Sequence, residues 1–158
     1  FRPWIQESTA TQKGQTPDEY AAGQAKLWKD GLASWGQTGE RIQKIRDAGN
    51  ERVWLTERGN MYGYNNLVVD FRNIPVMKKF QVPVIMDCTH SVQRPGNSSG
   101  STGGNREYIG AMALAAKAFG ADGYFMEVHP DPDRTKSDGP NMLYLRDLEA
   151  VVASLLDA

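Results

Sequence analysis

Three short apolar runs recur along the later part of the chain, and each is followed by a polar segment and then by a stretch with helical spacing. The runs are Val53–Leu55, Val82–Met86 and Tyr124–Met126. Consecutive apolar residues over this length are typical of strands that are covered on both faces, so we expect all three runs to be buried. Strands that alternate with helices predict a parallel sheet with right-handed crossovers.

The expected elements extend a little beyond these runs. Strands are predicted over residues 53–57, 82–87 and 123–128. Helices are predicted over residues 71–79, 106–119 and 145–156. The middle helix is rich in alanine and is expected to stop at Gly120, because glycine commonly follows the last helical residue.

The residues before the first run have a different pattern. Thr16-Pro17-Asp18-Glu19 combines a capping threonine, a proline for the first turn and an acidic residue, which predicts a helix start. A second helix is expected from Thr38 to a stop at Gly49-Asn50. We therefore divide the chain into an amino-terminal segment, residues 1–48, and consecutive βα units over residues 49–158.

Composition narrows the class of protein. The chain has 158 residues, a formal net charge of -1 and 40% hydrophobic residues, which is enough for one globular domain. The charge balance predicts no nucleic-acid partner and no membrane surface, and no apolar run approaches the ~20 residues that a membrane helix needs. The single cysteine, Cys88, excludes an internal disulfide and is typical of a reducing cytoplasm, where we expect the protein to act.

Polar side chains gather where each predicted strand ends. The three clusters are Glu57–Arg58, Asp87–Gln93 and Glu127–Asp133, and the last continues to Asp138. The carboxyl ends of parallel strands meet at one rim, because neighbouring strands lie ~4.8 Å apart. Parallel α/β folds place their functional sites at this rim, so we expect the clusters to form one site.

Arg58 is the candidate anion-binding residue of the first cluster. Its guanidinium is a planar fork of donors that suits phosphate or carboxylate, and Gly59 lets the backbone turn sharply or approach a ligand. The alternative is an ordinary loop between a strand and a helix, with a solvated arginine.

A metal site is the second candidate. The chain has only two histidines, His90 and His129, and both fall in the clusters. His90, Glu127 and Asp138 offer a mixed nitrogen and oxygen ligand set for a divalent metal ion. The alternative is that each residue caps a loop or a helix, since the sequence lacks the short spacings of common metal motifs.

Two further features leave alternatives open. Cys88 lies two residues before His90, on the same side of an extended chain, but a small buried thiol is the commoner role. The loop from Ser98 to Gly104 is rich in hydroxyls and glycines. It either holds a phosphate through backbone amides or is a long surface loop.

Several motifs occur along the chain in an order and spacing that are typical of one family. They are Thr56–Gly59, Gly63–Asp70, Thr89–Gln93, Gly103-Gly104, His129–Pro132 and Ser137–Gly139. From about Gly49 to the end, the chain resembles the 3-deoxy-D-manno-octulosonate 8-phosphate (Kdo-8-phosphate) synthase family. The resemblance implies an α/β fold of the (β/α)8 TIM-barrel type, of which only the last three βα units are clearly represented here.

The resemblance also implies an activity. Members of the family condense phosphoenolpyruvate with D-arabinose 5-phosphate to give Kdo-8-phosphate and phosphate, a transferase reaction of lipopolysaccharide biosynthesis. It implies a divalent metal ion of unspecified identity as cofactor, phosphorylated small molecules as substrates, and a homotetramer.

Site residues follow from the resemblance position by position. Metal ligands are expected at His90, Glu127 and Asp138, and His90 and Asp138 are also expected to be catalytic. Substrate-binding roles are expected at Arg58, Asn65, Gln93, Thr102 and Lys13. Arg58 matches the arginine that holds the phosphoenolpyruvate phosphate, and Thr102 stands where a serine touches the phosphate of arabinose 5-phosphate.

The match also sets limits on the activity that we expect. The earlier strands of the barrel, with a fourth metal ligand, have no clear counterpart, so the chain looks incomplete and is expected not to catalyse the condensation by itself. One alternative is a non-catalytic fragment, or a binding or structural derivative of this barrel. Another is a related phosphoenolpyruvate-dependent sugar-acid synthase.

Overall fold

The computed structural model describes residues 38–61, 66–95, 103–135 and 138–157. The expected helix that starts at Thr16, and the candidate residues Lys13, Asn65 and Thr102, lie outside these ranges. The chain divides into two units, Phe1–Glu51 and Arg52–Ala158. In the part that the structure describes, no helix is long and apolar enough to cross a membrane.

In the first unit, residues 38–47 are helical. The helix ends as the sequence predicts, because Gly49 has a backbone φ of +89°. The amide of Gly49 donates to the carbonyl of Arg46 at 2.8 Å, and the amide of Asn50 donates to the carbonyl of Ile45 at 3.2 Å. This pair of bonds is the Schellman motif, which satisfies carbonyls that the helix leaves free at its end.

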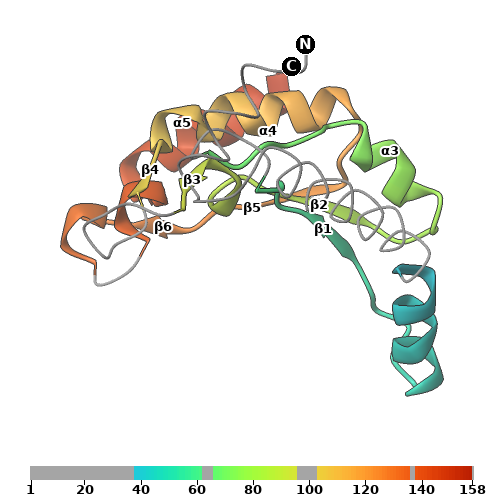
Figure 1. Cartoon of the computed structure of the whole chain (residues 1–158). Coiled ribbons are helices and arrows are strands. Elements are labelled where there is room, and N and C mark those ends of the chain that lie inside the picture. The colour runs from blue at the N-terminus through green and yellow to red at the C-terminus, as the bar shows by residue number, and fades with distance from the viewer. Residues whose placement is uncertain (1–37, 62–65, 96–102, 136–137, 158) are drawn as a thin grey trace, which may run out of the picture. The chain divides into compact units, whose positions relative to one another are not determined.

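The second unit is built on a parallel sheet in the order β1-β2-β5 (Figure 1). The strands are β1 (Leu55–Glu57), β2 (Val84–Asp87) and β5 (Gly123–Phe125). Thr56 pairs with Ile85, and Met86 pairs with Tyr124. The predicted parallel sheet is therefore confirmed, and each strand is shorter than its predicted range.

Three helices follow these strands and lie together along one face of the sheet (Figure 1). They are α3 (Asn73–Lys78), α4 (Ile109–Ala118) and α5 (Leu145–Asp157). A short 3-10 turn, η2 (Arg106–Tyr108), precedes α4 in the range where a single longer helix was predicted. The last helical residue is Ala118, and Gly120, after the C-cap Phe119, has the left-handed φ of +84° that is common where helices stop.

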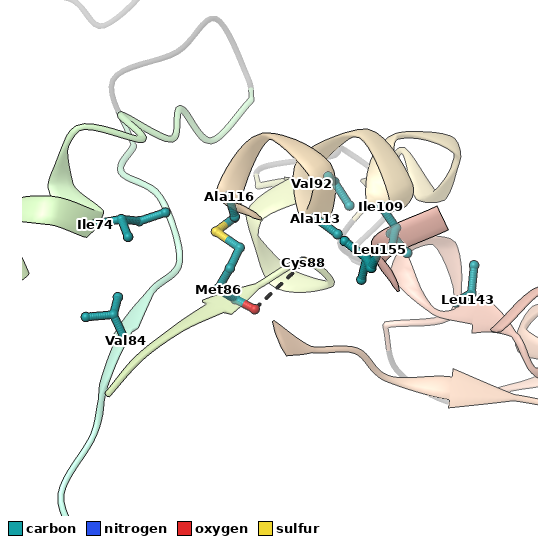
Figure 2. Packing of buried hydrophobic residues seen from close by; sticks show 10 residues of the cluster. All are labelled: Ile74, Val84, Met86, Cys88, Val92, Ile109, Ala113, Ala116, Leu143 and Leu155. Carbon is teal, nitrogen blue, oxygen red and sulfur yellow. Dashed lines mark hydrogen bonds between the residues drawn. The ribbon is translucent and has the colours of Figure 1, made fainter. Parts of the chain in front are cut away.

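The core lies between β2 and these helices. Met86 is fully buried on β2 and reaches toward Ala116 of α4, as Figure 2 shows. Ile74 of α3 and Leu155 of α5 belong to the same cluster, together with Val84. Removing this apolar surface from water is the main favourable contribution to folding of the unit.

The prediction that all three runs are buried is wrong in part. Val84 and Met86 are buried, but Trp54 is 66% exposed and Phe125 is 44% exposed. Side chains on a strand alternate between two faces, and α3, α4 and α5 pack on the face that carries Val84 and Met86. A continuous apolar run therefore does not by itself show that both faces are covered within the described residues.

Shorter elements follow the carboxyl ends of the strands. β3 (Gln93–Arg94) pairs antiparallel with β4 (Gly103–Gly104), and β6 (Val128–His129) pairs parallel with β7 (Leu143–Tyr144). The 3-10 turns among them are η1 (His90–Val92), η3 (Pro132–Arg134) and η4 (Gly139–Asn141). The third predicted strand thus stops at Phe125, and only its last residue, Val128, belongs to the next strand, β6.

Replacing Met86 by alanine is expected to destabilise the protein. The side chain is fully buried, so the change removes apolar contacts and leaves a cavity, which costs about 2–5 kcal/mol in the free energy of unfolding. Urea unfolding measures this loss. The matched control is Met61→Ala, because Met61 is 76% exposed and its loss should change stability by less than about 0.5 kcal/mol. Equal effects of the two changes would contradict the packing described.

Cys88 is expected to be unreactive in the folded protein. It belongs to the core cluster, and burial, with a smaller effect of the Asp87 charge, raises the pKa of its thiol to about 12. Maleimide labelling at pH 8 should be slow in the native protein and fast in urea, because the thiolate is the reactive form. The raised pKa also means that stability falls as the pH rises from 9.0 toward 12. Fast native labelling would contradict this environment.

Candidate functional site

The site begins with a buried carboxylate at the end of β1. Glu57 is buried, and its Oε1 accepts the amide of Gly59 at 2.6 Å while its Oε2 accepts the side-chain amide of Asn73 at 2.8 Å. Gly59 has a φ of +87°, and a Cβ there would lie 3.2 Å from the carbonyl of Val68. These contacts fix the turn that carries Arg58 at the rim of the sheet.

A second buried carboxylate, Asp87 at the end of β2, sets the position of His90. Its Oδ1 accepts the backbone amides of Thr89 at 3.1 Å and His90 at 2.8 Å. Its Oδ2 lies 2.8 Å from Nδ1 of the His90 ring. A carboxylate only accepts, so Nδ1 carries a proton and the neutral ring presents the lone pair of Nε2.

His90, Glu127 and Asp138 converge on one point. One ligand atom from each lies within 4.8 Å of the others. His90 Nε2 is 3.6 Å from Oε1 of Glu127, and the His90 ring stacks on Phe125 with centroids 5.8 Å apart. Thr89 holds the backbone of Glu127, since its Oγ1 accepts a hydrogen bond from the Glu127 backbone N–H at 2.7 Å.

This donor set fits a divalent metal ion. It combines one imidazole nitrogen with carboxylate oxygens, and the carboxylate of Asp87 orients the imidazole through its other nitrogen, as is usual for histidine ligands. Oε2 of Glu127 is buried and has no hydrogen-bond partner within the part of the chain that the structure describes. A buried carboxylate oxygen without a partner is costly, and a bound cation would satisfy it.

Gln93 connects Arg58 to this group. Nη2 of Arg58 donates to Oε1 of Gln93 at 2.9 Å, and Nε2 of Gln93 donates to Oδ1 of Asp138 at 2.8 Å. Arg58 itself is exposed at the rim, and this bond uses one of the five donors of its guanidinium. The structure therefore places a cationic fork beside the three candidate metal ligands.

Asp138 lies in a tightly held segment. It has a φ of +53°, and the next residue, Gly139, has no room for a Cβ, which would lie 2.5 Å from the carbonyl of Pro132. Nη2 of Arg106 donates to the Gly139 carbonyl at 2.9 Å and to Oδ1 of Asp133 at 2.6 Å. The segment is thus tied to the turn before α4.

An aromatic residue of β7, Tyr144, also contacts Asp133 and Arg106. The Tyr144 hydroxyl donates to Oδ2 of Asp133 at 2.6 Å, and the Arg106 guanidinium lies 4.7 Å from the Tyr144 ring centre. The hydrogen bonds from Tyr144 and Arg106 lower the pKa of Asp133, and the bond to Asp133 raises the pKa of Tyr144. The turn η3 is thus held to β7 and to the turn before α4.

Some sequence-predicted residues have other roles, and one contributor was missed. His129 does not join the group of three, and its Nδ1 accepts the amide of Asp131 at 3.0 Å within a turn. Cys88 lies in the core instead of joining the site. Asp87 was not among the predicted site residues, although its spacing of three residues before His90 was a signal that it could orient the ring.

Comparison with known proteins begins with a family model described as the DAHP synthetase I family, which matches residues 11–157. A 2-dehydro-3-deoxyphosphooctonate aldolase of Nitratidesulfovibrio vulgaris is 55% identical over 114 residues, covering 72% of this chain and 42% of the relative. One of Rhodopseudomonas palustris is 51% identical over 127 residues, covering 80% of this chain and 44% of the relative. The chain therefore spans less than half the length of these curated relatives.

A solved structure also resembles the chain. Phospho-2-dehydro-3-deoxyheptonate aldolase (DAHP synthase) of Thermotoga maritima superimposes with a TM-score of 0.61 and 28% identity, over 72% of this chain and 31% of that one. That protein is a (β/α)8 barrel, which confirms the predicted fold class for the βα units seen here.

The relatives also confirm the resemblance that the motifs indicated, because their name denotes the Kdo-8-phosphate synthase reaction. The family match starts before residue 49, so it reaches further toward the amino terminus than those motifs did. With a match over residues 11–157, the chain belongs to the DAHP synthetase I family.

Proposed function

We propose that the protein containing this chain is a 3-deoxy-8-phosphooctulonate synthase, which condenses phosphoenolpyruvate with D-arabinose 5-phosphate. The observation that carries the proposal is the convergence of His90, Glu127 and Asp138 beside Arg58, in a chain about half identical to relatives with that name. We further propose that it acts in the cytoplasm as a homo-oligomer, with a homotetramer implied by the family resemblance.

Arg58 has the properties that binding of the phosphoenolpyruvate phosphate requires. It is exposed at the rim, and a hydrogen bond to Gln93 holds its side chain. The other N–H donors of its planar guanidinium are left to bind the phosphate oxygens. Thr102, Lys13 and Asn65 stay predictions for substrate contacts. Binding both substrates at fixed positions converts the condensation into an effectively unimolecular step, which is a large source of rate enhancement.

His90, Glu127 and Asp138 are proposed to hold a divalent metal ion. His90 would contribute Nε2, Glu127 its unpaired Oε2, and Asp138 its carboxylate. When bound, such an ion acts as a Lewis acid that polarises a carbonyl or activates water. Asp87 keeps the His90 ring turned toward the group, and Thr89 holds the backbone at Glu127.

The activity experiment measures phosphate release by the protein that contains this chain, with phosphoenolpyruvate, arabinose 5-phosphate and added divalent metal. A second candidate is a related phosphoenolpyruvate-dependent synthase, because the matching family and the similar structure bear the DAHP synthase name. Octonate and heptonate products differ by one carbon, so four-carbon and five-carbon aldose phosphates are compared. Turnover only with the four-carbon substrate would favour this candidate, and binding without turnover would favour a non-catalytic derivative.

Replacing His90 by alanine is expected to lower divalent metal affinity by at least about tenfold, because it removes one of three converging ligands. Metal content after mild dialysis measures the loss. His129→Ala is the matched control, since the second histidine lies outside the group and should retain the wild-type content. Equal metal content in wild type and His90→Ala would rule out this ligand role.

Replacing Arg58 by alanine is expected to weaken phosphoenolpyruvate binding by about 1.5–3 kcal/mol, the scale for a hydrogen bond to a charged group. Calorimetric titration measures the affinity. Arg72→Ala is the control, because the Arg72 guanidinium is already engaged with Asp70 at 2.8 and 2.7 Å. An unchanged affinity in Arg58→Ala would remove this residue from the anion site.

A further inference from the structure

The side chain of Gln93 occupies a distinctive position between the two charged parts of the site. It is buried, and each end of its amide has one charged partner, Arg58 at 2.9 Å and Asp138 at 2.8 Å. The resemblance predicted a substrate contact for Gln93. Both polar atoms of the side chain are instead engaged by protein groups in the structure.

The chemistry of the two partners fixes the orientation of this amide. A guanidinium only donates, so it requires Oε1 of Gln93, and an ionised carboxylate only accepts, so it requires Nε2. The amide therefore has one orientation that satisfies both neighbours. The flipped orientation would place donor against donor at Arg58 and acceptor against acceptor at Asp138.

The backbone of Gln93 is also held in place. The residue lies in β3, where it pairs with Gly104, and its backbone N–H donates to the backbone carbonyl of His90. The Gln93 carbonyl faces the amide of Leu67 at 3.4 Å. The fixed backbone and the fixed side-chain amide of Gln93 together hold the side chains of Arg58 and Asp138 at a set separation.

We propose that Gln93 is a positioning residue that links the anion site to the metal site, and that it acts through Arg58 and Asp138 instead of touching substrate. This inference rests on the proposed function, because it takes Arg58 as the phosphate site and Asp138 as a metal ligand. Arg58 is exposed and long, so without Gln93 its guanidinium samples more rotamers and loses more freedom when it binds an anion. Asp138 loses the donor that orients its carboxylate.

The test removes the amide and measures the two ends separately. Gln93→Met keeps the length of the side chain and abolishes both hydrogen bonds. Inorganic phosphate probes Arg58 and Mn²⁺ probes the three ligands, each titrated alone by calorimetry into the full protein. We expect both dissociation constants to rise about tenfold, which corresponds to about 1.4 kcal/mol each, while the midpoint of thermal unfolding stays close to that of wild type.

Two further variants keep the result interpretable. Gln43→Leu is the matched control, because it removes another amide-to-carboxylate bond, from Gln43 to Asp47 at 2.7 Å in the other unit, and should leave both affinities unchanged. Gln93→Asn retains a polar side-chain amide, so it is expected to fold even if Gln93→Met does not. Its side chain is one methylene shorter and cannot span both partners, so we expect it to lose wild-type affinity for at least one probe.

The outcomes separate the two proposals. If the wild-type protein fails to bind phosphate, Mn²⁺ or both, the proposed function fails. If wild type binds both and Gln93→Met binds both equally well, the linking role of Gln93 is wrong. It is also wrong if only one affinity falls in Gln93→Met, because the amide then serves that site alone, or if Gln93→Asn binds both probes as wild type does.

Discussion

The geometry of the site depends on the buried carboxylate of Asp87. A buried charge is stable only when donors surround it, and here the donors come from the turn that follows β2, through the amides of Thr89 and His90 and through the His90 ring. β2 ends at Asp87, and the next residues turn so that their amides donate to its carboxylate. One carboxylate thus accepts from the turn that follows β2 and also orients the imidazole.

From this turn, the order of the strands determines which groups meet. β2 is the central strand of the described sheet, so its carboxyl end lies beside both the turn after β1 and the segment after β5. Thr89 accepts the amide of Glu127, and Gln93 reaches Arg58 and Asp138. The helices pack with β2 in the core, and this close packing supports the strand whose end carries Asp87.

The sequence was sufficient for the parts of the fold that depend on local patterns. Alternating strands and helices predict a parallel sheet, and the glycine stops at Gly49 and Gly120 are local effects of backbone conformation. The exposure of Trp54 and Phe125 was not predictable from apolar runs, because burial depends on what covers each face. Several substrate-contact predictions, such as Thr102, fall outside the described residues and stay predictions.

The role of Gln93 depends on contacts far along the chain, which single-sequence patterns do not encode. Its partners lie 35 and 45 residues away, and only the folded sheet brings them to the two ends of one amide. The contact between Asp87 and His90 is easier to predict from the sequence, since an aspartate three residues before a histidine in a tight turn can reach the ring. What the sequence could not show is that the carboxylate would be buried and committed to that turn.

Two of the three converging residues have features that do not favour stability by themselves. Asp138 adopts a left-handed φ of +53°, and Glu127 keeps a buried oxygen without a partner among the described residues. Both features belong to residues of the group that converges on one point. The bonds from Arg106 to Gly139 and Asp133 hold the strained segment in place. A cation between these ligands would satisfy the unpaired oxygen, so the local cost and the proposed function have the same physical origin.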